Sequence, residues 1–227
     1  MLPIMDVSRW QGHINWDRVK ASGLVSGVML KAVSTNRKLS KRKDGLYIDP
    51  TFERNYRECK RVGLPVGVYY YTYATDKDMA DAELALLKTA LTGKTFELPI
   101  SVDVEDNKIK KLSTQALTDL AAYALATVEQ WGFYAMLYVG LNFAQTELYM
   151  VGAALRKYDV WLAMYPGDKS KTKPEDKPKT DFTFGMWQYT SAASVPGVSG
   201  NVDLSHAYKD YTKIITKKGL DRLREGK

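Results

Sequence analysis

The chain has 227 residues, of which 45% are hydrophobic and 26% are charged, ordinary values that exclude a wholly disordered chain, a collagen and a disulfide scaffold. The formal net charge of +7 favours anionic partners without choosing among nucleic acid, anionic membranes and bacterial wall polymers. With one cysteine and two histidines, the chain has neither an internal disulfide nor a thiolate or histidine-rich metal site, so we expect no metal and no cofactor.

Short apolar runs alternate with helical spacing along the chain. In chain order the pattern predicts strand 3–7, strand 25–33, helix 50–62, strand 65–74, helix 79–91, strand 98–104, helix 113–131 and strand 135–139. Asp49 is expected to cap the first of these helices, with Pro50 at its first helical position. A mixed region with short helix leads to Tyr158, and three closely spaced strands follow at 160–164, 184–189 and 200–204.

Alternation of strands and helices is typical of a parallel sheet covered by helices. The sequence therefore predicts an α/β fold: a single irregular, TIM-barrel-like β/α barrel of eight strands and about five helices over residues 1–210. A basic C-terminal helix or tail is expected over 211–227, and polar or basic loops over 36–46 and 168–181. No apolar run reaches transmembrane length, so we expect no membrane insertion. We also expect a monomer, and the first residues do not have the pattern of a signal peptide.

Four carboxylates are the strongest sign of chemistry. Asp103 and Glu105 are two positions apart at the end of a predicted strand, so they project from the same face. Alone, such a pair is more often a solvated strand end than a site. Asp6 and Asp203 are expected to end two other strands, and barrel enzymes keep their active sites where strands end. Carboxylates meeting at one rim suit glycoside hydrolysis; metal-dependent phosphoryl chemistry could use them too, but nothing else indicates a nucleotide.

Aromatic side chains near strand ends could stack on sugar rings, although at least half of them are expected only to pack the barrel. Tyr69, Tyr71 and Tyr73 alternate along one strand, Trp161 and Tyr165 lie near another, and Trp187 and Tyr189 near a third. The candidate substrate-binding residues are Tyr69, Tyr71, Tyr138, Trp161, Tyr165, Trp187 and Gln188.

Several motifs resemble those of glycoside hydrolase family 25 lysozymes, and together they span residues 3–206. They are Asp6-Val7-Ser8-Arg9-Trp10-Gln11-Gly12 with Ile14-Asn15-Trp16, Asp49-Pro50-Thr51-Phe52 with Asn55, Gly63-Leu64-Pro65-Val66-Gly67-Val68-Tyr69, Asp103-Val104-Glu105, Trp161-Leu162-Ala163, Trp187-Gln188-Tyr189, and Pro196-Gly197-Val198-Ser199-Gly200-Asn201-Val202-Asp203. Each match is modest, but their order and spacing make the resemblance specific.

The resemblance implies cleavage of the β-1,4 bond between N-acetylmuramic acid and N-acetylglucosamine in bacterial peptidoglycan. By the family pattern Glu105 is the general acid, Asp103 orients or stabilises the substrate acetamido group or the charge beside it, and Asp6 and Asp203 complete the acidic floor. The family is described as retaining, with the substrate acetamido group a candidate nucleophile. A chain of this family without a signal peptide resembles phage endolysins, which are made in a host cytoplasm and released through a holin lesion to reach the wall.

The chain departs from the family pattern after its second strand. Lys31-Ala32-Val33-Ser34-Thr35-Asn36 lacks the acidic residue and glycine of the family's turn, and a basic insertion follows it. Two rival functions stay open from the sequence: a catalytically silent barrel that binds glycan, and a hexosaminidase that acts on chitin-type glycans. Aromatic residues interleave poorly with the basic stretches, so nucleic-acid binding is not expected.

Overall fold

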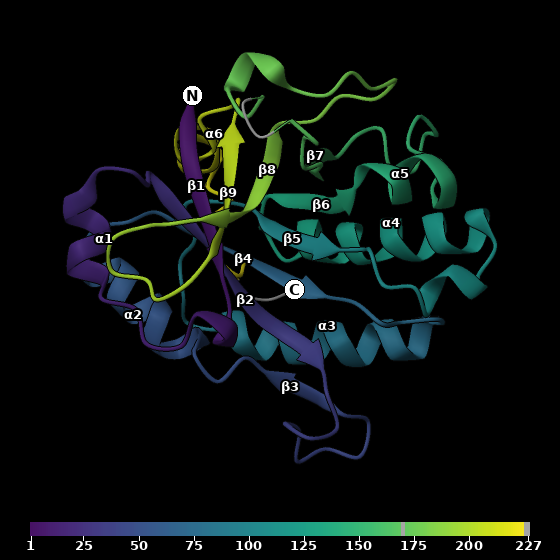
Figure 1. Cartoon of the computed structure of the whole chain (residues 1–227). Helices are drawn as coiled ribbons and strands as arrows, with labels where there is room; N and C mark the ends of the chain where they lie inside the picture. Colours follow the sequence, from purple (N-terminus) through teal and green to yellow (C-terminus); the bar gives the residue numbers. More distant parts are fainter. Residues whose placement is uncertain (169–170, 225–227) are drawn as a thin grey trace.

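The protein is described by a computed structural model that covers residues 1–168 and 171–224 (Figure 1). Its strands form one sheet in the order β1-β9-β8-β7-β6-β5-β4-β2-β3, and pairing of β1 with β2 closes eight of them into a barrel, with β3 outside it. The strands are β1 Leu2–Val7, β2 Gly27–Thr35, β3 Leu46–Ile48, β4 Val66–Tyr71, β5 Ile100–Asp103, β6 Ala135–Gly140, β7 Asp159–Ala163, β8 Met186–Ala193 and β9 Val202–Ala207. The predicted eight-stranded α/β barrel is confirmed.

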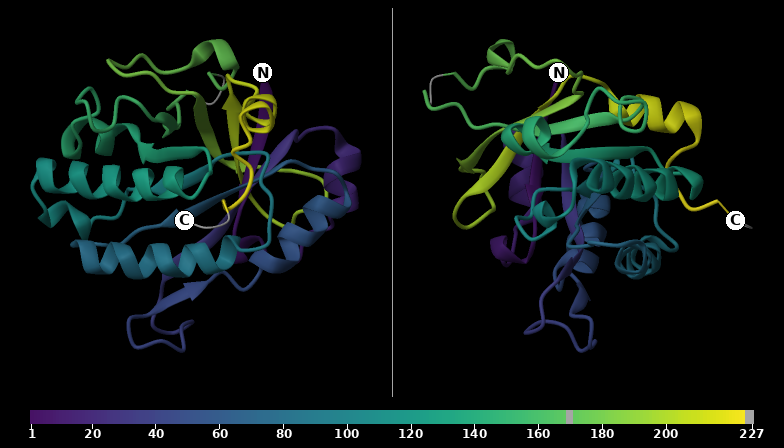
Figure 2. Two further views of the ribbon diagram at one scale, coloured as in Figure 1. Left: turned by 180° about the vertical axis from the view of Figure 1, so that it is seen from behind. Right: turned by 90° about the vertical axis from the view of Figure 1, so that its right-hand side faces the viewer.

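Helices pack mainly on one side of the barrel. Figure 2 shows α2, α3 and α4 along the strands of the first half, whereas loops and α6 lie beside β7, β8 and β9. This asymmetry follows from the sequence, because the described residues of 164–185 and of 194–201, between the last strands, contain no α-helix. The α-helices are α1 Trp16–Ser22, α2 Phe52–Arg61, α3 Lys77–Leu91, α4 Thr114–Gln130, α5 Leu141–Glu147 and α6 Tyr211–Lys218, and the 3-10 helices are η1 Arg9–Gln11, η2 Ile109–Lys111 and η3 Pro174–Asp176.

Two apolar clusters hold the fold together. The larger lies between the sheet and its helices, and the smaller fills the barrel interior. Helix α6 contributes Tyr211 and Ile215 to the interior cluster, both fully buried. The backbone N–H of Phe96 donates to the carbonyl of Asp221 at 2.8 Å, which ties the end of the described chain to the barrel. Helix α6 covers 211–218 of the segment for which a basic helix or tail is expected, and it packs against the barrel. Residues 225–227 of that segment lie outside the described residues.

Strand β9 departs from the prediction of a parallel barrel. It runs antiparallel to both of its neighbours, with Asp6 of β1 opposite Asp203 of β9. The reason is the short connection from β8, residues 194–201, because parallel neighbours need a crossover of about a dozen residues or more and a shorter link joins antiparallel ones. Asp203 therefore lies near the beginning of its strand and does not end a parallel one, yet the reversed direction still brings it to the rim where the other strands end.

Helix α2 begins later than expected. Thr51 is its N-cap residue and Phe52 its first residue, so the predictions for Asp49 and Pro50 are wrong. Asp49 instead accepts hydrogen bonds from the backbone N–H of Thr51 at 2.9 Å and of Arg9 at 3.0 Å. Its side chain thus joins the segment after β1 to the start of α2.

Strand β3 also differs from the prediction. It pairs antiparallel with the end of β2, and its first residue, Leu46, falls in the predicted 36–46 loop.

Candidate active site

The four carboxylates predicted from the sequence gather at one rim of the barrel. Asp6 lies on β1, Asp103 is the last residue of β5, Glu105 follows two residues later, and Asp203 lies on β9. Asp6 and Asp103 are 7% and 3% exposed, whereas Glu105 is half-buried. The charges of Asp203 and Glu105 both act on Asp6, and that of Glu105 acts on Asp103. Side chains almost 200 residues apart in sequence therefore form one acidic cluster.

Gln188 holds this cluster together from β8. Its Nε2 donates to Oδ2 of Asp6 at 2.8 Å and to Oδ2 of Asp203 at 3.4 Å. Its Oε1 accepts from the hydroxyl of Tyr138 at 3.0 Å and from that of Tyr165 at 2.7 Å. The side-chain amide of Gln188 thereby donates to two carboxylates through its nitrogen and accepts from two tyrosine hydroxyls through its oxygen. These contacts fix all four side chains in one arrangement.

Burial raises the pKa of every member of the acidic cluster. The pKa of Asp103 lies well above its usual range, first through burial and then through the charge of Glu105. The pKa of Asp6 is also well above its usual range through burial and the charge of Asp203, while the hydrogen bond from Gln188 lowers it. Burial raises the pKa of Asp203 to about 6 and that of Glu105 above its usual value. The cluster therefore retains protons at pH values where exposed carboxyls have lost them.

Lys31 is a site residue that the motif search did not select. It lies on β2, and its Nζ is 4.9 Å from the ring centroid of Tyr71. Its positive charge lowers the pKa of both Asp103 and Glu105, and burial lowers its own pKa. The available signal was a single lysine inside an otherwise apolar strand, because a buried charge needs a partner. Oδ1 of Asp103 is buried and has no hydrogen-bond partner among the described residues.

The predicted aromatic residues divide into two groups. Tyr138 and Tyr165 line the cavity beside Glu105, and the hydroxyl of Tyr71 donates to Oδ2 of Asp106 at 3.1 Å, next to Glu105. Tyr69 lies deeper, with its ring centroid 6.1 Å from that of Trp161. The two predicted tryptophans, Trp161 and Trp187, do not line the cavity.

Trp161 and Trp187 are fully buried and belong to the packing of the barrel. Nε1 of Trp161 donates to Oγ of Ser205 at 2.9 Å in the interior. Nε1 of Trp187 donates to the carbonyl of Met164 at 2.8 Å, and its ring packs near Tyr189 and His206. Since strand neighbours point to opposite faces, Trp187 points away from the cluster that Gln188 contacts.

An open cavity of about 530 Å³ adjoins the cluster. Glu105, Asn107 and Lys110 form one wall of it, and Tyr138 and Tyr165 contribute aromatic surface. The size is typical of sites for small ligands.

Among the described residues no group of three or more His, Cys, Asp or Glu side chains could hold a metal ion. In the same part of the chain no helix is long and apolar enough to span a bilayer.

A family model described as glycosyl hydrolases family 25 matches residues 5–198. The chain belongs to this family. Its curated relatives include the uncharacterized protein YegX of Escherichia coli K12, 28% identical over 203 residues that cover 88% of this chain and 67% of YegX. The autolytic lysozyme of Clostridium acetobutylicum is 26% identical over 201 residues, which cover 88% of this chain and 54% of that enzyme. Lysozyme M1 of Streptomyces globisporus is 27% identical over 210 residues, which cover 88% of this chain and 65% of that enzyme.

Solved structures of family 25 have the same fold. The family 25 glycosyl hydrolase GHIP of Streptococcus pneumoniae superposes with a TM-score of 0.75 at 22% identity, over 96% of this chain and 92% of that one. A lysozyme from Streptomyces coelicolor superposes with a TM-score of 0.73 at 23% identity, over 96% of both chains. The fold predicted from the sequence resemblance is therefore the family's fold.

Proposed function

We propose that this family 25 protein is a lysozyme that hydrolyses the β-1,4 bond between N-acetylmuramic acid and N-acetylglucosamine in bacterial peptidoglycan. The observation that carries the proposal is the set of four carboxylates that three strands bring to one rim beside an open cavity. Two curated relatives are lysozymes. The pneumococcal autolysin LytC, which superposes with a TM-score of 0.69 at 24% identity over 90% of this chain and 46% of that one, has been solved with a synthetic peptidoglycan ligand.

Glu105 is the general acid in this mechanism. It is half-buried and lines the cavity, and burial raises its pKa above that of an exposed glutamate. A raised pKa leaves a larger fraction of the carboxyl protonated at a given pH, and the protonated form can give its proton to the glycosidic oxygen as the bond to the muramic acid carbon breaks. The positive charge of Lys31 lowers the pKa of Glu105 and so opposes the effect of burial. The distance between the two side chains therefore affects the fraction of Glu105 that is protonated at a given pH.

Asp103 stabilises the charge that develops on the sugar. The carboxyl of Asp103, which is 3% exposed, can accept from the N–H of the 2-acetamido group, which then presents its carbonyl oxygen to the anomeric carbon. Attack by this oxygen forms a cyclic intermediate, and water later opens it as the Glu105 carboxylate takes a proton from the water. Asp6 and Asp203, fixed by Gln188, form the acidic floor below. The net reaction adds water and gives a reducing end at muramic acid.

Two aromatic side chains, Tyr165 in the cavity lining and Trp10 outside it, can provide surface for the sugars. Tyr165 is 48% exposed while its hydroxyl is fixed on Gln188, so its ring is held in place and still open to a ligand. Trp10, in the helix η1 that follows β1, is 74% exposed, and the guanidinium of Arg9 stacks 3.9 Å from its ring centroid. Rings held in this way can stack on pyranose faces at low entropic cost. Trp161 and Trp187 have no such role because both are buried.

The test is release of reducing ends from purified peptidoglycan, with mass spectrometry of the products and chitin oligomers as the second substrate. We expect soluble fragments that reduce at muramic acid and slow or no cleavage of chitin. Equal cleavage of chitin would favour the hexosaminidase alternative. Glycan binding without any release would favour the silent barrel. In this proposal the protein acts on the bacterial cell wall. Its release from a host cell through a holin lesion and its monomeric state stay predictions.

A further inference from the structure

A second cavity, of about 830 Å³, lies beside the cavity that contains Glu105 and has a positively charged lining. Its charged lining consists of Arg37, Lys38, Lys108, Lys111 and Asp44. Asp44 is already paired with Arg42, whose NH2 lies 2.6 Å from its Oδ2. Within the described residues none of the four cations forms an ion pair, so the cavity has an excess of positive charge available to a ligand.

The two cavities share a wall. Asn107 and Lys110 face the cavity that contains Glu105, whereas Lys108 and Lys111 of the same turn face the basic one. Tyr73 also lines the basic cavity, 4.9 Å by ring centroids from Tyr71 and 5.0 Å from Nζ of Lys108. A ligand group in the basic cavity is therefore separated from the cavity that contains Glu105 by one turn of chain.

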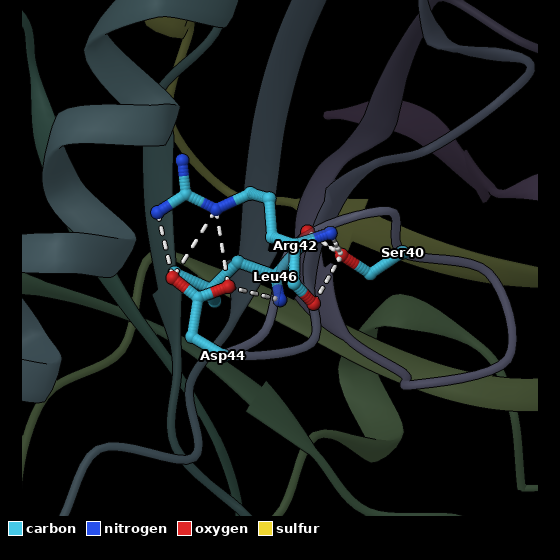
Figure 3. A network of polar contacts seen from close by, with 4 residues as sticks. All are labelled: Ser40, Arg42, Asp44 and Leu46. Atoms are coloured by element: carbon cyan, nitrogen blue, oxygen red, sulfur yellow. Dashed lines mark hydrogen bonds and ion pairs between the residues drawn. The ribbon is translucent and has the colours of Figure 1, made fainter.

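The loop that supplies two of the cations is held in shape by its own hydrogen bonds. Oδ1 of Asp44 accepts from the backbone N–H of Leu46 at 3.0 Å, and Oγ of Ser40 accepts from that of Arg42 at 2.9 Å (Figure 3). The N–H of Asn36 donates to the carbonyl of Gly45 at 2.8 Å and closes the loop. Positions 37 and 38 are therefore presented by an ordered loop, which reduces the entropic cost of binding.

We infer that the basic cavity binds the carboxylates of the peptide stem attached to muramic acid in peptidoglycan. The inference rests on the proposed function, because the stem is joined to the muramic acid whose glycosidic bond is cleaved. A sugar chain in the cavity that contains Glu105 would carry that stem across the rim, and stem carboxylates match lysine and arginine in charge and hydrogen bonding. The basic cavity thus binds the part of the substrate that plain chitin lacks.

The experiment compares two substrates: peptidoglycan freed of phosphate polymers, and the same glycan strands after an amidase has removed their peptides. The test variant is Arg37→Gln/Lys38→Gln. The matched control is Lys41→Gln/Lys43→Gln, which removes the same charge from the same loop at positions outside the cavity lining. Thermal unfolding of each variant verifies the fold.

For the wild type we expect a higher kcat/KM on peptide-bearing strands, and for the test variant a loss of about tenfold in that value, mainly through KM. Activity of both variants on peptide-free strands should stay near the wild-type value. Equal losses in the test and control variants would overturn the inference in favour of general attraction to an anionic wall. Equal cleavage of both substrates by the wild type would also overturn it, as would a wild-type preference that appears only when phosphate polymers are left on the wall. Cleavage of neither substrate would instead refute the proposed function, and the inference with it.

Discussion

Replacing Gln188 by leucine tests how the acidic cluster is held. The side chain is 1% exposed and donates to Asp6 at 2.8 Å while accepting from Tyr138 at 3.0 Å. Leucine has a similar volume and removes these hydrogen bonds. A bond to a charged group contributes about 1.5–3 kcal/mol, and a buried hydroxyl left unpaired costs about 1–3 kcal/mol. We therefore expect Gln188→Leu to lower the free energy of unfolding by about 3 kcal/mol.

The same substitution should also change the pH dependence of activity. The bond from Gln188 lowers the pKa of Asp6, so its loss raises that pKa, and Asp6 becomes ionised only at a higher pH. The acidic limb of the kcat/KM profile should therefore move upward in pH.

Thermal unfolding and a pH–rate profile on solubilised peptidoglycan measure both effects. For a chain of this size about 3 kcal/mol corresponds to a fall in Tm of roughly 6–12 °C. Gln115→Leu is the matched control because Gln115 is exposed on α4, and a surface change should cost no more than about 0.5 kcal/mol. If Gln188→Leu behaves like Gln115→Leu in stability and profile, Gln188 does not hold the cluster.

Three further predictions concern the barrel. Gly67→Ala should lower the free energy of unfolding, measured with urea, by about 1–3 kcal/mol, because a Cβ at position 67 would lie 2.5 Å from Sδ of Met29. The control Gly167→Ala should leave that free energy unchanged, because nothing lies within 4 Å of a Cβ at position 167. Trp187→Phe should destabilise the fold by about 1–3 kcal/mol and leave the kcat/KM of folded protein unchanged; a raised KM would place Trp187 in the site after all. Burial raises the pKa of Glu83 to about 7, so its contribution to stability is full below pH about 4 and is lost as the pH rises through 7. Glu83→Gln should remove up to about 3 kcal/mol of this decline between pH 4 and pH 8 in urea unfolding, and an unchanged decline would exclude Glu83 as its source.

Much of the barrel could be predicted because its strands and helices have strong local patterns. The 113–131 prediction corresponds to α4 with a difference of one residue at each end, since its apolar positions repeat at helical spacing. The direction of β9 could not be read in this way. Strand patterns are the same for parallel and antiparallel pairing, and only the short link before Val202 carried the information.

The carboxylates of the site were predictable, but their supports were less so. Asp103 and Glu105 are close in sequence, and strand ends explain Asp6. Gln188 was selected only within a motif, and its contacts with Asp6 and Asp203 depend on barrel closure. Trp187 was predicted to bind substrate because composition cannot tell which face of a strand meets the cavity. Register decides that, and it places Trp187 on the far face from Gln188. Trp161 does face the barrel interior, but it is fully buried there, and composition does not tell how deep in the barrel a side chain lies.

The most direct test of the account is the activity of Glu105→Gln on purified peptidoglycan, with the products analysed by mass spectrometry. Glu129→Gln is the matched control, since Glu129 is exposed on α4 and pairs with Lys157 at 3.1 Å. We predict that Glu105→Gln has wild-type thermal stability or higher, because a buried carboxyl is replaced by a neutral amide. Its rate should fall by several orders of magnitude, about 10²–10⁴-fold or more, while Glu129→Gln keeps full activity. A Glu105→Gln protein that releases muramic acid reducing ends at the wild-type rate would contradict the account.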